Sequence, residues 1–75
     1  MIIIQEDKYI IELNTSYDNI TGYIVQLDNM IRLGTFNILL SKGHQNLNIE
    51  YVSLDNINIV NSLVLKIFEK YGRNY

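Results

Sequence analysis

The sequence predicts an α+β domain of the order ββαββα, in which a four-stranded antiparallel sheet carries two helices on one face. Two kinds of pattern lead to this fold class. Short runs with alternating apolar residues are typical of half-buried strands, and two longer stretches place apolar residues at helical spacing. Both patterns occur in the same order in residues 1–34 and 35–72, which predicts a tandem ββα repeat within one domain of residues 1–75.

Four segments carry the strand pattern. Residues 2–5 and 8–13 flank a tight turn at Glu6 and Asp7, and residues 36–40 and 47–54 flank a longer loop. Alternate residues of the better-defined strands form one apolar face, which we expect to lie under the helices: Tyr9, Ile11, Leu13, Phe36, Ile38, Leu40, Leu47, Ile49 and Tyr51.

Residues 16–34 admit two interpretations, a helix or a β-hairpin that turns at Asp28 and Asn29. The helix is favoured because an apolar stripe spans an arc of about 140° at helical spacing. The stripe consists of Tyr17, Ile20, Tyr23, Ile24, Leu27, Met30 and Ile31.

The ends of this segment also suit a helix. Asp18 and Arg32 lie where the helix dipole favours an anion and a cation, and Gly34 suits the left-handed position after the last turn. The residues between them argue for the hairpin, because Gly22 and Thr21 are poor helix formers. We take the helix as the prediction and keep the hairpin as its alternative.

A second helix is predicted from Asp55 to just before Gly72. Lys66 and Lys70 lie in its later turns, where the dipole favours cations. Its apolar stripe again spans about 140°. The members of this stripe are Ile57, Val60, Leu63, Val64, Ile67, Phe68 and Tyr71.

Composition argues against several classes of function. The chain has no cysteine and one histidine, which argues against disulfides, thiolate catalysis and the usual structural zinc sites. The net charge of −2 argues against tight binding to a phosphate backbone. No stretch approaches the ~20 apolar residues of a membrane span, so we predict a cytoplasmic protein, or one of the host cytoplasm if the gene is viral.

Few residues are candidates for chemistry. His44 has no oriented partners in the sequence, so we predict a solvated loop residue. The repeat places Glu12 and Glu50 at matching positions on the sheet face away from the helices, where close carboxylates could act as acid and base or bind a cation. Two unrelated surface glutamates are the simpler interpretation. We therefore predict no enzyme, no cofactor, no metal and no small-molecule ligand.

The outer sheet face is the predicted interface, because apolar residues gathered on an uncovered face often mark one. Ile3, Ile10, Leu39 and Val52 are expected there, and Ile59 and Leu65 lie on the polar side of the second helix. We predict a non-enzymatic, self-associating protein-interaction module, such as an inhibitor, adaptor or antitoxin-like regulator of a phage or mobile element. It would bind through this face or an exposed edge strand.

The alternative is a dimeric nucleic-acid-binding regulator. It would use the basic residues, which a dimer would concentrate: Lys8, Lys42, Lys66, Lys70 and Arg73.

Overall fold

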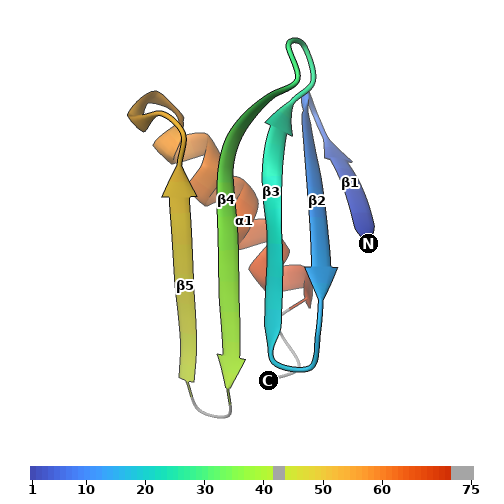
Figure 1. Ribbon diagram of the computed structural model, residues 1–75, viewed down its shortest axis with the longest axis vertical. Helices are drawn as coiled ribbons and strands as arrows, with labels where there is room; N and C mark the ends of the chain where they lie inside the picture. The colour runs from blue at the N-terminus through green and yellow to red at the C-terminus, as the bar shows by residue number, and fades with distance from the viewer. Residues whose placement is uncertain (42–43, 72–75) are drawn as a thin grey trace.

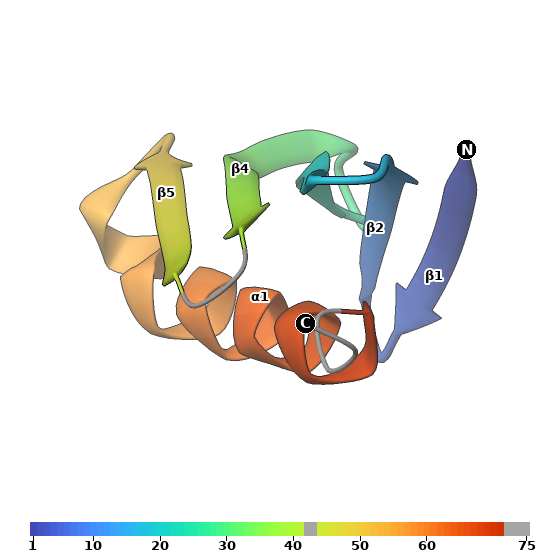
Figure 2. The same cartoon turned by 90° about the horizontal axis from the view of Figure 1, so that it is seen from below.

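The computed structural model describes residues 1–41 and 44–71, which form a sheet of five antiparallel strands and one α-helix (Figure 1). The elements are β1 Ile2–Glu6, β2 Tyr9–Thr15, β3 Asn19–Gln26, β4 Ile31–Ser41, β5 His44–Tyr51, the 3-10 helix η1 Leu54–Asn56 and α1 Ile57–Tyr71. The strands lie in sequence order, so β1 and β5 are the edges. Figure 2 shows α1 on one side of the sheet, extending from β5 toward β2.

The predicted ββαββα fold with four strands and two helices is therefore wrong. Residues 16–34 contain β3, a turn and the start of β4 instead of the first helix. All of residues 1–34 are described, and they contain no helix, so the two predicted halves of the chain differ and the tandem ββα repeat is not present.

The predicted apolar stripe of the first helix divides between different environments. Ile20 and Ile24 are buried in the core, with 1% and 0% of their surface exposed. Tyr17, Met30 and Ile31 are 90%, 65% and 51% exposed, although a helix would have buried them with the others. The position of each residue explains the division: Ile20 and Ile24 lie on the inner face of β3, whereas Tyr17 precedes β3, Met30 lies in the turn after it and Ile31 begins β4.

A left-handed residue and two hydrogen bonds define the turn between β3 and β4. Met30 has a left-handed φ of 57°, and its N–H donates to the carbonyl of Gln26 at 2.8 Å. The side-chain oxygen of Asn29 accepts from the N–H of Ile31 at 3.1 Å. Asparagine is suited to such turns because its side chain can satisfy nearby backbone groups. The alternative interpretation, a hairpin turning at Asp28 and Asn29, is the one the structure shows.

Two glycines lie where backbone or side chains approach closely. A Cβ at Gly22 would overlap the carbonyl oxygen of Glu12 and lie 2.8 Å from Cζ of Phe36. Gly34 lies within β4 and does not end a helix. A Cβ there would lie 2.9 Å from the carbonyl oxygen of Glu50 and 3.3 Å from Cγ1 of Val60. Gly34 thus allows α1 to pack close to the sheet.

A β-bulge interrupts β4 next to this contact. Ile24 pairs with Gly34 and Val25 pairs with Arg32, so Leu33 is an extra residue on β4. Leu33 joins the core and is 3% exposed. The bulge thus adds an apolar side chain to the core and keeps Arg32 on the opposite face.

The C-terminal helix agrees with the sequence pattern. α1 begins after η1, and the side chain of Ser53 caps η1 by accepting from the N–H of Asp55 at 3.3 Å. The buried residues of α1 are Val60, Leu63, Val64 and Ile67. They pack against a sheet face made of Ile11, Leu13, Ile20, Ile24, Leu33, Phe36, Ile38 and Leu40.

Candidate functional site

The sheet face opposite α1 is polar at its centre. Strand register aligns residues that share this face into two adjacent rows: Glu12, Tyr23, Thr35 and Glu50, and Asn14, Thr21, Asn37 and Asn48. A hollow of about 220 Å³ lies over the β4 and β5 end of these rows, lined by Thr35, Phe36, Asn37, Asn48 and Glu50. The apolar interface predicted for this face is thus divided by polar rows.

The three side chains Glu12, Tyr23 and Arg32 interact on this face. The hydroxyl of Tyr23 donates to the carboxylate of Glu12. The guanidinium of Arg32 lies over the ring of Tyr23, with Cζ 4.1 Å from the ring centroid. The hydrogen bond to Glu12, with partial desolvation and the charge of Glu12, raises the pKa of Tyr23 above 10.0, while Arg32 opposes the rise.

This arrangement predicts a titration that absorbance can follow. The tyrosinate of Tyr23, identified by its loss in Tyr23→Phe, is expected to form above pH 10.0, and Glu12→Gln is expected to lower its pKa. Because the pKa of Tyr23 is raised in the folded state, its protonated hydroxyl stabilises the fold. This stabilisation is fully present below pH 10.0 and is lost as the pH rises through the folded-state pKa. An unchanged midpoint in Glu12→Gln would contradict the contact.

The two candidate glutamates do not form a close pair. Glu12 lies on β2 and Glu50 on β5, in one row that also includes Tyr23 and Thr35. Three strand spacings separate them, about 14 Å, beyond the distance at which two carboxylates share a proton or a cation. No group of three metal-ligating side chains is found in residues 1–41 and 44–71. The side chain of His44 lies outside what the structure describes.

The predicted interface residues do not form one patch. Ile3, Ile10 and Leu39 share the outer face, but Ile10 pairs with Val25 and Leu39 with Asn19. Those partners are six residues apart on β3, so Ile10 and Leu39 are about 20 Å apart. Of the other three, Val52 follows β5, Ile59 packs against the core, and Leu65 lies on α1.

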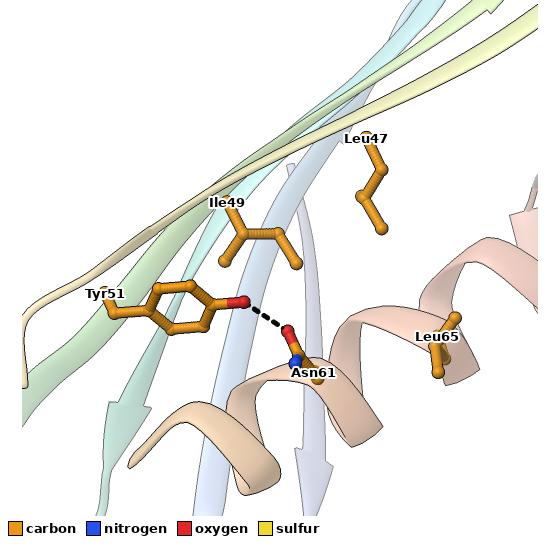
Figure 3. A pocket seen from close by; sticks show the side chains of 5 residues that line it. All are labelled: Leu47, Ile49, Tyr51, Asn61 and Leu65. Carbon is orange, nitrogen blue, oxygen red and sulfur yellow. Dashed lines mark hydrogen bonds between the residues drawn. The ribbon is translucent and has the colours of Figure 1, made fainter. Parts of the chain in front are cut away.

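Leu65 marks a different surface, a groove between β5 and α1. This β5 groove has a volume of about 450 Å³ and is lined by Leu47, Ile49, Tyr51, Asn61 and Leu65. Figure 3 shows the three β5 side chains directed toward α1, where the hydroxyl of Tyr51 donates to the side-chain oxygen of Asn61. A hollow of about 180 Å³ adjoins it and shares Leu47 and Leu65.

The β5 groove exposes apolar surface because one helix covers a sheet for which the sequence predicted two. α1 begins near the carboxyl end of β5 and slants toward β2 (Figures 1 and 2). Leu47 is left 44% exposed and Leu65 53% exposed. Both residues face the same opening, so their exposed surfaces form one apolar site rather than scattered surface residues.

The backbone of β5 adds a second feature to this opening. The N–H of Val52 donates to the carbonyl of Leu33 at 3.0 Å, so the backbone groups of Val52 face β4. Backbone groups on a strand alternate in direction, so those of Leu47, Ile49 and Tyr51 face away from the sheet. Within the part of the chain that the structure describes, no strand pairs with this side of β5.

The other edge is less available. β1 has five residues against eight in β5, and Ile2 and Ile4 pack against the core. Nζ of Lys66 on α1 lies 2.8 Å from the carboxylate of Glu6, at the end of β1. The β5 edge is therefore longer, and it adjoins an open apolar groove.

Three of the five basic residues of the nucleic-acid alternative lie in the described part of the chain. Lys66 is paired with Glu6, and Nζ of Lys70 lies 5.6 Å from the ring centroid of Tyr71. Lys8 lies in the turn between β1 and β2, whereas Lys42 and Arg73 lie outside the described residues. The alternative stays a prediction.

Sequence reasoning identified Leu65 but assigned Leu47, Ile49 and Tyr51 to a face covered by two helices. Leu65, apolar on the polar side of its helix, was the signal for the β5 groove. No helix in the described part of the chain is long and apolar enough to cross a membrane, and the cytoplasmic location stays a prediction. Comparisons with protein families, curated proteins and solved structures find nothing that matches this chain.

Proposed function

We propose that the chain is a non-enzymatic protein-binding module that receives an extended segment of protein along β5. One observation carries the proposal: Leu47, Ile49 and Tyr51 direct their backbone groups outward and their side chains into the β5 groove. In strand addition, backbone hydrogen bonds supply affinity and pockets for alternate side chains supply specificity. β5 has both features on the same residues.

The geometry also specifies what the received segment is like. A strand that pairs with β5 directs alternate side chains toward α1, where Leu47 and Leu65 expose apolar surface. Those side chains are therefore apolar, and the ones between them face the polar side of the sheet. Inhibitors, adaptors and antitoxins all act by binding other proteins. Binding through β5 does not distinguish these narrower roles, so they stay predictions.

A synthetic peptide tests the proposal. The probe is an eight-residue peptide of alternating valine and threonine, with lysine added at both ends for solubility. We expect hydrogen exchange measured by NMR to slow at the amides of Leu47, Ile49 and Tyr51 when the peptide binds. The amide of Val52, already bonded to Leu33, is the internal reference.

Two matched variants define the site. Leu65→Lys is expected to weaken peptide binding about tenfold or more, a loss of ~1.4 kcal/mol, because it places a charge in the β5 groove. Leu54→Lys is the control, since Leu54 is exposed but lies in η1 outside the lining of the groove. Equal losses in the two variants, or slowed exchange on β1 instead of β5, would contradict the proposal.

A further inference from the structure

We infer that the segment received by β5 is β5 of a second copy of this chain. This inference rests on the proposed function and names its partner. The two strands pair antiparallel about a two-fold axis beside Ile49, which joins the two five-stranded sheets into one continuous sheet. Three features of β5 carry the inference: its apolar order, its charge pattern and its place beside the β5 groove.

The apolar residues of β5 are spaced symmetrically about Ile49. An axis beside Ile49 places Ile49 opposite Ile49 of the second copy, and Leu47 opposite Tyr51. These are the three residues whose backbone groups face outward, so donors of each strand meet acceptors of the other. The paired side chains are apolar or aromatic, and all of them face α1.

The charge pattern fits the same register. On the outer face, Asn48 lies opposite Glu50 of the second copy, so an amide that can donate meets a carboxylate on each side of the axis. An axis beside Glu50 would place two carboxylates opposite each other. It would also centre the pairing on a residue whose backbone groups face β4.

The pairing also covers the exposed apolar residues. An axis perpendicular to the sheet keeps both α1 helices on one face, so each copy brings its own Leu47 and Leu65 to the contact. Stable interfaces bury about 800 Å² per partner. That area is a moderate share of the 5054 Å² of solvent-accessible surface. The strand β5 supplies a contact about 26 Å long, in a molecule whose longest dimension is 38 Å.

Disulfide cross-linking tests the register directly, because the chain has no cysteine of its own. In the proposed dimer, the two copies of residue 49 have Cα atoms about 5.5 Å apart, within the range that a disulfide spans. We expect Ile49→Cys to cross-link under mild oxidation at least tenfold faster than Leu47→Cys or Asn48→Cys. Faster cross-linking of either control would overturn the register.

Sedimentation of the unaltered chain tests the dimer itself. We expect the mass of two chains at high concentration, and a shift to the mass of one chain in Leu65→Lys. The mass of one chain at every concentration would overturn the inference. Slowed exchange of the β5 amides by the valine–threonine peptide would then still support the proposed function, whereas failure of both tests would remove it as well.

Discussion

Gly22→Ala is expected to destabilise the domain by about 2 to 3 kcal/mol, the upper range for overpacking a well-packed site. The added methyl group would overlap the carbonyl oxygen of Glu12 on the neighbouring strand and press against the ring of Phe36. Domains of this kind are stable by only about 5 to 15 kcal/mol, so the larger Gly22→Val is expected to abolish folding. Urea unfolding followed by circular dichroism measures both effects.

The sign of the stability change in Gly22→Ala distinguishes the helix from the hairpin interpretation of residues 16–34. In a helix, Gly22→Ala would stabilise the domain by about 1 kcal/mol. Combining it with Phe36→Leu is expected to recover only part of the loss, because the Glu12 carbonyl belongs to the backbone and cannot give way. A raised urea midpoint in Gly22→Ala would contradict the hairpin.

Leu63→Ala is expected to cost about 2 to 5 kcal/mol, whereas Leu65→Ala is expected to cost less than about 1 kcal/mol. The two residues are two positions apart in α1 and point to different sides of the helix. Leu63 is 2% exposed in the core, whereas Leu65 lines the β5 groove. The pair controls for helix propensity, since both substitutions are identical. Measurement at a concentration that keeps the chain monomeric separates folding from association.

Equal losses in these two variants would mean that α1 presents a different face to the sheet. The groove would then be closed by α1 itself, and neither the peptide nor the second copy could occupy it. This comparison therefore also tests the orientation of α1 on which the proposed function depends.

The sequence predicted correctly those elements whose buried residues fit either helical spacing or strand alternation, but not both. In α1, the buried residues Val60, Leu63, Val64 and Ile67 follow helical spacing and no strand alternation. In β2, the buried Ile11 and Leu13 alternate with the polar residues Glu12 and Asn14, which no helical stripe reproduces. These segments form their predicted structures because local pattern and tertiary burial agree.

The segment of β3 and β4 was misread because a spacing of four residues satisfies both periods. Ile20 and Ile24 lie on one face whether the chain is helical or extended, so they could not decide between them. The deciding contact, the ring of Phe36 against Gly22, joins residues that pair only in the folded sheet. Glycine in a strand is unfavourable by local propensity, and this tertiary contact explains why it is present.

The candidate site was missed for a related reason. Adding a helix over residues 16–34 covered the whole inner face of the predicted sheet, so the outer face was the only surface left for function. With that segment in the sheet, α1 is the only described helix on the inner face, and the apolar side chains of β5 are left partly uncovered. One wrong element thus moved the predicted site from one face to the other.

The order of the strands also has a consequence for how the chain acquires its structure. Each strand pairs with the one made just before it, so the sheet assembles through short loop closures, which favours fast folding. α1 follows all five strands in the chain, so it is synthesised after them. The apolar inner face of the sheet is therefore uncovered until α1 is made, and transiently exposed apolar surface of this kind favours aggregation.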